Sequence, residues 1–440
     1  MAKEKKEKKK KGEEQPAASA GGAAPAEGAA AAEPKKDRKE KEKKEKKKQP
    51  ESSPRKFLSP LIPFYKLALN LREFRLATGM EQVRWLNAPV ISIGNLSTGG
   101  TGKTPFTIML ARELSRYNLP VDVLSRGYGR QSEEVLRVDP AGTAEEFGDE
   151  PLLIAREAEV PVYVGAERLD AGFMAEKEAW ANLREIAKQI DAEAKAEGRE
   201  AAPVEVPAEQ EILRYYRRTL KTLARPTEPD AKKRHGAEPE TVETEPGPFC
   251  IHLLDDGFQH RQLARTVDIL LLTRQDWFDK LLPAGNLREP LDALFRANVI
   301  VIPATEPELE DLLRAWNWEG EIWFMHRVLE VKKIEGPVVA FCGIGRPDQF
   351  FEGLEANELK LAAQFTFPDH YEYTEAIVRE LVASAVTHKA KAVLTTAKDL
   401  ARLGKLAELF NDVVPLEVAH LRVVVQDKGA MLSWLAERLL

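Results

Sequence analysis

A glycine-rich segment contains the first residues whose types and spacing point to chemistry. Residues 97–104 read STGGTGKT, which matches the phosphate-binding pattern G-x-x-x-x-G-K-[ST] except that Ser97 replaces its first glycine. Glycines let backbone N–H groups turn toward phosphate oxygens, and the helix expected after them presents its positive end. Lys103 is placed to reach the β- and γ-phosphates, and Thr104 to offer a hydroxyl to Mg²⁺. The predicted nucleotide-binding residues are Ser97, Thr98, Gly99, Gly100, Thr101, Gly102, Lys103 and Thr104.

Two carboxylates follow an apolar run of strand length in the segment IHLLDDGFQH, residues 251–260. Asp255 and Asp256 stand where proteins with such a phosphate loop place the acid that holds Mg²⁺, directly or through water. Paired aspartates also occur in ordinary turns, but Gln259 and His260 add two polar side chains at the same strand end. Because ligands bind at the carboxyl ends of parallel strands, we predict that this cluster belongs to the same site.

Three further polar segments fall where loops would line that edge of the sheet. SRGYGR (125–130) places two arginines in a glycine-containing turn, which suits an anionic phosphate. GDEP (148–151) has two acids directly before a predicted helix, and LLPAGNLREP (281–290) has an arginine followed by a glutamate. Each segment alone is typical of a surface loop, but together they indicate one site. The candidate residues are Arg126, Asp149, Glu150, Arg288 and Glu289.

The elements that must position these loops alternate between short β-branched runs and helical stretches. Such alternation indicates an α/β fold with a parallel sheet covered by helices on both faces. A second alternation of strand-like and helical segments begins after about residue 320. We therefore predict an α/β P-loop domain over residues 55–325 and a smaller α/β domain over 326–440, whose last helix packs back on the first. Strands are predicted at 89–95, 121–129 (with a turn), 161–165, 249–256, 267–273 and 298–304, and helices at 105–117 and 151–158.

Two segments depart from this pattern. The first fifty residues contain 17 Lys/Arg and 10 Asp/Glu and so carry about +7; with −6 for the whole chain, the remainder carries about −13. This composition predicts a disordered tail over residues 1–54. The tail is either a solubiliser or a polybasic patch attracted to anionic lipid or nucleic acid. Residues 171–248 combine charged helical stretches with a Pro-rich loop, which predicts an insertion in the first domain.

The segment 57–80 is predicted to be a helix that is apolar over much of its circumference, with Lys66, Arg72 and Arg75 among its residues. It either packs against the first domain or lies in a membrane surface. No apolar run reaches the roughly 18 residues of a spanning helix, and no signal peptide is visible. Cys250 and Cys342 each lie in an apolar run, which argues for a reducing compartment and against a disulfide framework or zinc site. We expect a cytosolic chain.

Taken together, these segments resemble the tetraacyldisaccharide 4′-kinase family of lipid A biosynthesis. The shared segments occur in the family's order over roughly residues 57–400, apart from the insertion, and DDGFQH together with LLPAG-x-LREP is the most specific part. The tail and the block at 171–248 are departures from the family pattern. The resemblance rests on GNLSTGGTGKTP, SRGYGR, GDEP, VPVYVGAER, LDDGFQHRQLARTVDILLL, LLPAGNLREP, FCGIGRPDQF, FPDHYEYT and TTAKD.

The resemblance implies transfer of the γ-phosphate of ATP, with Mg²⁺, to the 4′-hydroxyl of a lipid A disaccharide 1-phosphate. Asp149 matches the family's catalytic aspartate, and His370 of FPDHYEYT matches a histidine that acts with it; Lys103 is the third predicted catalytic residue. The expected metal ligands are Thr104, Asp255, Asp256 and Glu289. The residues expected around the substrate are Arg126, Glu150, Gln259, His260 and Arg288.

The same resemblance implies a location at the cytoplasmic face of the inner membrane of a Gram-negative bacterium. A kinase whose acceptor carries four acyl chains works at a bilayer surface, which favours an interfacial helix at 57–80, with the basic tail adding attraction to anionic lipid. We expect a monomer that binds the lipid precursor and no nucleic acid. The catalytic pair would lie on different domains, which predicts closure over ATP during turnover.

Two other functions stay open from the residues alone. A P-loop GTPase or ATPase would use hydrolysis as a switch or chaperone for a protein partner, although no N-K-x-D run for guanine recognition is present. A nucleotide-sensing scaffold without catalysis would rest only on the insertion and the tail. An assay that follows phosphate into a lipid distinguishes both from a kinase.

Overall fold

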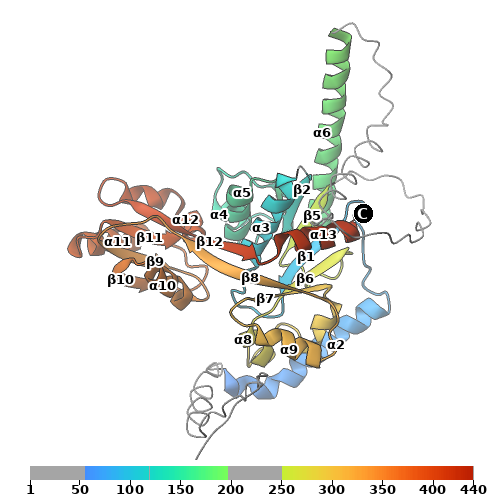
Figure 1. Cartoon of the computed structure of the whole chain (residues 1–440), viewed down its shortest axis with the longest axis horizontal. Helices are drawn as coiled ribbons and strands as arrows, with labels where there is room; N and C mark the ends of the chain where they lie inside the picture. Colours follow the sequence, from blue (N-terminus) through green and yellow to red (C-terminus); the bar gives the residue numbers. More distant parts are fainter. Residues whose placement is uncertain (1–54, 118, 197–249, 440) are drawn as a thin grey trace, which may run out of the picture. The chain divides into compact units, whose positions relative to one another are not determined.

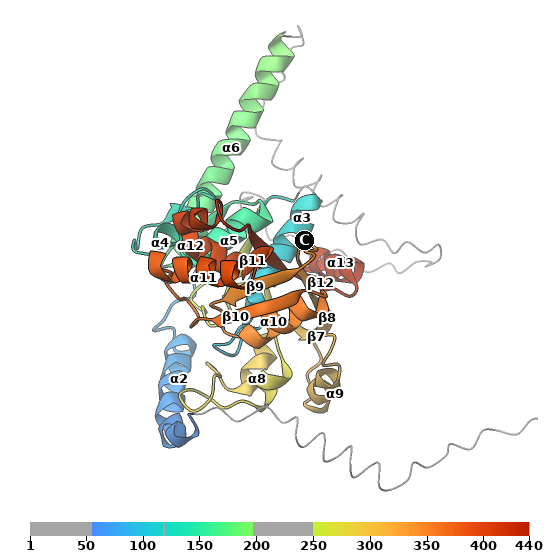
Figure 2. The ribbon, with the colours of Figure 1, turned by 90° about the vertical axis from the view of Figure 1, so that its left-hand side faces the viewer.

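A mostly parallel sheet of twelve strands organises the residues that the structure describes, in the order β10-β9-β11-β12-β8-β7-β6-β1-β5-β2-β4-β3. The structure is a computed structural model and describes residues 55–117, 119–196 and 250–439. Helices cover both faces of the sheet (Figures 1 and 2). The α/β architecture predicted from the alternating runs is confirmed.

The five central strands are parallel and buried on both faces. Successive side chains point to opposite faces, so Ile269 packs in the core on one face while Leu270 packs in the core on the other. This two-sided burial is the reason that the strands are continuous apolar runs. Their bounds are β1 (Val90–Asn95), β2 (Val121–Ser125), β5 (Ile251–Asp255), β6 (Val267–Leu271) and β7 (Val299–Pro303).

The helices around these strands divide into two layers. Residues of α3 and α5 belong to the core on one face of the sheet, and residues of η2 and α9 belong to the core on the other. Short strands β4 and β3 extend the sheet beyond β2. The bounds are α3 (Lys103–Arg116), β3 (Leu136–Arg137), α4 (Ala144–Phe147), α5 (Asp149–Ala158), β4 (Val162–Val164), α6 (Arg168–Ala196), α8 (Arg274–Phe278), η2 (Leu291–Arg296) and α9 (Glu308–Ala315).

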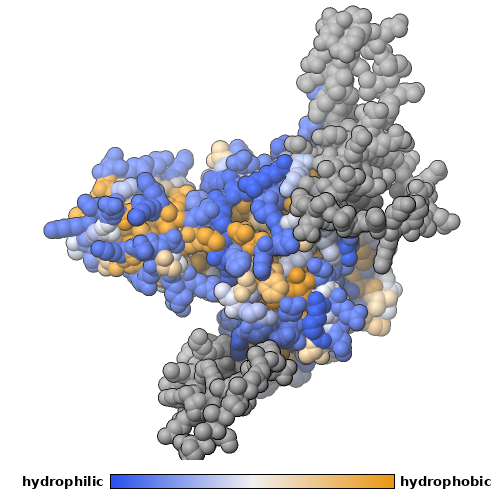
Figure 3. Space-filling view, viewed as in Figure 1, coloured by the Kyte–Doolittle hydropathy of each residue, from blue (hydrophilic) through white to orange (hydrophobic). Residues whose placement is uncertain are grey.

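The C-terminal region continues the same sheet. The long strands β8 and β12 pair antiparallel, and β11, β9 and β10 follow as parallel strands with their own two apolar cores. Figure 3 shows hydrophobic side chains gathered over β12 and β8. The bounds are β8 (Glu321–Glu330), β9 (Pro337–Cys342), α10 (Pro347–Ala356), β10 (Lys360–Thr366), α11 (Glu375–Thr387), β11 (Ala392–Thr396), α12 (Ala397–Leu403), η3 (Gly404–Phe410), β12 (Leu416–Val425) and α13 (Lys428–Leu439).

The sheet runs without interruption across the expected domain boundary. Residues 325 and 326, where the smaller domain was expected to begin, lie inside β8. In the final helix, Met431 and Leu435 pack in the same core as Phe106 of α3. The end of the chain therefore contributes directly to the core around the central strands.

The N-terminal segment forms a short 3₁₀ helix, η1 (Lys56–Leu61), followed by α2 (Ile62–Ala77). One side of α2 packs against the core beneath α8 and α9 through Ile62, Tyr65 and Leu69. Four other large apolar side chains of α2, Phe64, Leu67, Leu71 and Phe74, are exposed. None of the helices in the described ranges is long and apolar enough to cross a membrane.

The predicted insertion begins as a helix, because α6 extends 29 residues from Arg168. Its first turns pack against the sheet through Leu169, Ala171 and Ala175. The second predicted helical stretch, the Pro-rich loop and the N-terminal tail lie outside the described residues. Both cysteines are buried and free of disulfide bonds.

Candidate active site

The phosphate loop ends at the start of α3, where its backbone forms an anion site. Gly102 precedes α3 with φ of +94°, a left-handed conformation that glycine adopts without strain. A Cβ at Gly102 would lie 3.3 Å from the Arg327 guanidinium. The buried hydroxyl of Thr101 has no hydrogen-bond partner in the described part of the chain. The loop thus presents an open polar cradle and the positive end of a helix to a phosphate.

Ser97 has a structural role in place of the first glycine of the motif. Its buried Oγ accepts a hydrogen bond from Asn95 Nδ2 at 3.2 Å. The same Asn95 accepts from Lys103 Nζ through Oδ1 at 2.8 Å, and its carbonyl oxygen accepts from Gln259 Nε2 at 2.9 Å. Asn95, the last residue of β1, therefore links the loop, the lysine and the DDGFQH segment.

Asp255, the last residue of β5, and Asp256, which follows it, have opposite electrostatic environments. Burial and the nearby carboxylates of Glu150 and Asp256 raise the pKa of Asp255 to about 7. Burial also raises the pKa of Asp256, but Lys103 at 3.3 Å and Arg288 at 2.8 Å outweigh it and lower the pKa to about 2. Asp256 holds a left-handed φ of 49°, which is uncommon outside glycine. The crowded carboxylates form a set of oxygen ligands that suits Mg²⁺.

Asp149 and His370 meet although 221 positions separate them in the sequence. Asp149 is the first residue of α5, and its Oδ1 accepts from the Glu150 backbone N–H at 2.9 Å. Its Oδ2 lies 3.1 Å from His370 Nδ1. His370 has φ of +59°, a conformation that in non-glycine residues concentrates at functional sites. The predicted catalytic pair is thus brought together, and His370 lines the cleft.

Two cations from α12 complete the surroundings of Asp149. Arg402 donates to Asp149 Oδ2 from Nε at 2.8 Å and from Nη2 at 2.6 Å. Lys398 Nζ lies 3.8 Å from the same oxygen and 3.1 Å from Glu150 Oε1. Burial raises the pKa of Asp149, but the His370 hydrogen bond and the Lys398 and Arg402 charges outweigh it and hold the pKa well below its usual range. Asp149 is therefore ionised at any physiological pH.

A second basic group lies on the side of the cleft toward α2. Arg168 is only 7% exposed, lines the cleft and has no partner for its Nε within the described ranges. Burial and the charge of Arg126 lower the pKa of Arg168 to about 10. Burial and the charges of Arg168, Arg265 and Arg72 lower the pKa of His260 to about 3, so His260 is neutral. This concentration of positive charge favours an anionic ligand.

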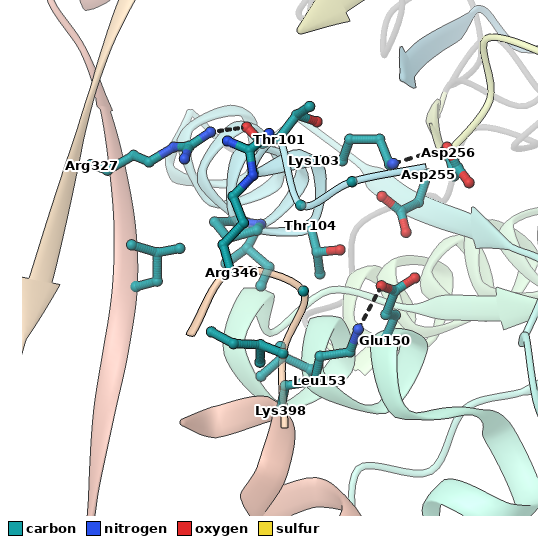
Figure 4. A pocket seen from close by; sticks show the side chains of 18 of the residues that line it. Thr101, Lys103, Thr104, Glu150, Leu153, Asp255, Asp256, Arg327, Arg346 and Lys398 are labelled. Atoms are coloured by element: carbon teal, nitrogen blue, oxygen red, sulfur yellow. Dashed lines mark hydrogen bonds and ion pairs between the residues drawn. The ribbon is translucent and has the colours of Figure 1, made fainter. Parts of the chain in front are cut away.

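One cleft of about 1540 Å³ contains most of the predicted residues. Figure 4 shows the loop residues Thr101, Lys103 and Thr104 opposite Asp255, Glu150 and Lys398. Glu289 instead forms an ion pair with Arg296 at 2.6 Å and, like the buried Ser97 and Asp149, is absent from the lining. The predicted residues that line the cleft are Thr98, Gly99, Gly100, Thr101, Gly102, Lys103, Thr104, Arg126, Glu150, Asp255, Asp256, Gln259, His260, Arg288 and His370.

The comparisons with known proteins agree with this geometry. A family model described as tetraacyldisaccharide-1-P 4′-kinase matches residues 54–183 and 231–440. The chain belongs to this kinase family. The family comprises ATP-dependent kinases of lipid A biosynthesis, and the unmatched residues 184–230 fall within the predicted insertion.

Two relatives in the 4′-kinase family align over nearly their whole length. The tetraacyldisaccharide 4′-kinase of Koribacter versatilis is 33% identical over 390 residues, covering 86% of this chain and 97% of the relative. The enzyme of the same name from Aquifex aeolicus is 31% identical over 82% of this chain and 95% of the relative. A crystal structure of LpxK from Aquifex aeolicus in complex with ATP superposes with a TM-score of 0.57 at 27% identity, covering 88% of this chain and 99% of that chain.

The 4′-kinase site also contains residues that no sequence pattern singled out. Arg168 lies in the segment VGAER and Lys398 in the segment TTAKD, and both segments contributed to the resemblance without a role for the basic residue. Arg402 lies four positions beyond Lys398, so one turn of α12 carries both toward Asp149. Their positions relative to the acids depend on pairing between distant segments, which local patterns do not reveal.

Proposed function

We propose that this chain transfers the γ-phosphate of ATP to the 4′-hydroxyl of tetraacyldisaccharide 1-phosphate. One observation carries the proposal: a single cleft joins a phosphate loop, an acidic pair suited to Mg²⁺ and His370, which lines the cleft from the segment after β10 and is backed by the buried Asp149 of α5. A nucleotide switch needs the phosphate loop and the acidic pair, but it does not need an Asp–His pair to accept a proton from an acceptor.

The phosphate loop and its neighbours would hold the triphosphate. Lys103, at the start of α3, is the cation for the β- and γ-phosphates, and the α3 N-terminus supplies backbone donors. Thr104, Asp255 and Asp256 would hold Mg²⁺, which when bound neutralises charge on the phosphate oxygens. The raised pKa of Asp255 reflects burial first and then the negative charges of Glu150 and Asp256, which a divalent cation would relieve. Most of the rate acceleration would come from this positioning and neutralisation.

The Asp149–His370 pair would prepare the acceptor hydroxyl. With Nδ1–H donated to Asp149 Oδ2, His370 has Nε2 left to accept a proton. As the sugar oxygen attacks the γ-phosphorus, its O–H bond breaks toward Nε2 and the bond from phosphorus to the ADP oxygen breaks. Asp149 fixes the ring tautomer and balances the charge that His370 gains. The strongly lowered pKa of Asp149 suits this orienting role.

The basic residues near α2 would bind the 1-phosphate of the acceptor. Arg168 and Arg126 line the cleft, and Arg72 reaches from α2 to the carbonyl oxygen of Gln259. A neutral His260 can donate one hydrogen bond there without adding a charge. Arg72 thus connects this group to the helix proposed to contact the membrane, the side from which a lipid substrate would arrive.

We propose that α2 lies in the cytoplasmic surface of the inner membrane. Its inner side packs on the core, yet its outer side exposes large apolar side chains at helical spacing. A helix in water normally turns charged residues outward, so an apolar outer side indicates a nonaqueous partner. Lys66 and Arg75 are exposed on the same helix, where they would meet anionic headgroups. The outer residues of α2 are Phe64, Leu67, Leu71 and Phe74, and the exposed Phe57 and Leu61 of η1 precede them.

Label from [γ-³²P]ATP tests the proposal directly. The purified full-length chain is incubated with tetraacyldisaccharide 1-phosphate in detergent micelles, and label in the lipid is measured. We expect lipid labelling that falls at least about 100-fold in the K103A, D149N and H370A variants, with unchanged melting temperatures. Hydrolysis of GTP or ATP that ignores the lipid, with no labelled lipid, would establish the switch alternative instead.

A further inference from the structure

The side chain of Arg402 is fixed by contacts with other residues of the C-terminal region. Its Nη1 donates to the carbonyl oxygen of Gly343 and lies 3.2 Å from Asp399 Oδ1. Asp399 is completely buried and accepts hydrogen bonds from Tyr373 Oη at 3.0 Å and from the Gly343 backbone N–H at 3.1 Å. The Thr396 hydroxyl donates to its other oxygen at 2.6 Å. This network leaves the guanidinium little freedom to move.

The opposite edge of the guanidinium faces Asp149. Nε and Nη2 both donate to Oδ2, the oxygen that also faces His370 Nδ1. Nη2 lies 3.4 Å from His370 Nδ1 and 3.3 Å from Asp369 Oδ1. Arg402 therefore contacts the proposed catalytic pair directly, although it is absent from the cleft lining.

We propose that Arg402 is a positioning residue for phosphoryl transfer: its fixed guanidinium sets the Asp149 carboxylate in the orientation that aligns His370. The inference rests on the proposed function, in which Asp149 and His370 prepare the acceptor hydroxyl. A planar, bidentate cation suits this task better than a flexible ammonium, because its two N–H groups define the position of the bound oxygen.

The contacts of Arg402 distinguish a positioning role from a role that only attaches the C-terminal region to α5. Arg422 of β12 also forms an ion pair with α5, through Glu157, and is held on its other side by Glu330 at 3.0 Å. Arg402 and Arg422 thus both tie the C-terminal region to α5, but only Arg402 contacts Asp149. Loss of Arg402 removes ion pairs with Asp149, Asp369 and Asp399, and loss of Arg422 removes ion pairs with Glu157 and Glu330. Arg422 therefore provides a control for the loss of charged contacts between the C-terminal region and α5.

The test compares the R402M, R402K and R422M variants of the full chain in the lipid-labelling assay. For R402M we expect kcat to fall about 30- to 300-fold while KM for ATP changes less than threefold, because misalignment of the pair affects the chemical step. R402K should recover part of the loss. R422M should stay within threefold of the unaltered chain. Melting temperatures and ATP binding by each variant establish that the protein is folded.

The pH dependence of kcat provides a second measurement, because loss of a purely structural contact would leave the pH profile of kcat unchanged. Without the Arg402 charge the Asp149–His370 pair holds a proton more tightly, so the acid limb of the R402M profile should move to higher pH while that of R402K stays in place. The inference would be overturned if kcat fell equally in R402M and R422M. It would also be overturned if the acid limb of the R402M pH profile stayed at the pH of the unaltered chain. Full activity in D149N and H370A would instead remove the proposed function on which it rests.

Discussion

Replacement of two outer leucines of α2 should release the chain from membranes without unfolding it. Leu67 and Leu71 are 67% and 60% exposed, so neither contributes much to the core. Burial of a whole leucine side chain in an apolar medium stabilises by about 1.5–3 kcal/mol. With about two-thirds of each side chain available to lipid, the L67S/L71S variant should lose about 2–4 kcal/mol of membrane affinity, or roughly 30- to 700-fold in partitioning.

Co-sedimentation of the purified chain with liposomes that contain anionic phosphatidylglycerol measures this partitioning. The control is V386S/V413S, which removes two valines of similar exposure, 59% and 54%, from α11 and a C-terminal loop. The control should bind liposomes like the unaltered chain, and both variants should melt within about 2 °C of it. Equal binding by L67S/L71S and the unaltered chain would refute the role of the outer side of α2.

Two further predictions concern buried charges. Burial lowers the pKa of His252, but Asp122 at 2.7 Å and Glu176 at 3.7 Å outweigh this and raise it well above its usual value. Stability from the charged imidazole is therefore fully present below about pH 6.5 and is lost as pH rises through the folded pKa. Urea unfolding should show this decline above pH 7 in the unaltered chain and a flatter profile in H252Q. Separately, R168M should raise KM for the lipid at least about tenfold and leave KM for ATP within threefold; equal changes in both would place Arg168 at the nucleotide instead.

Sequence patterns predicted many of the strands, helices and loops of this protein. The strand from Val90 to Asn95, the glycine-rich turn and the helix from Lys103 follow from local rules of burial and backbone freedom. Gly102 is a clear case, because its left-handed φ at the start of α3 requires glycine there. Such features depend on neighbours within a few residues, so the order of residues is enough to indicate them.

Local sequence patterns could not predict which residues the polar and charged side chains contact. Ser97, which replaces the first glycine of the motif, accepts a hydrogen bond from Asn95, and Asn95 accepts one from Lys103. Glu289, which was predicted to be a metal ligand, forms an ion pair with Arg296 and is absent from the cleft lining, so its role at a metal stays a prediction. A side chain at a strand end can turn toward the cleft or toward the core, and only the packing around it decides which.

The sequence by itself determined the α/β class, the nucleotide loop and a family resemblance that named the Asp149–His370 pair, because these depend on local patterns and on motifs in a recognisable order. Only the tertiary structure brought the carboxylate of Asp149 within 3.1 Å of His370 and set Arg402 behind it. The physical reason is that β8 and β12 continue the central sheet into the C-terminal region. That pairing carries α12 to the start of α5, a contact between positions about 250 residues apart that no local pattern specifies.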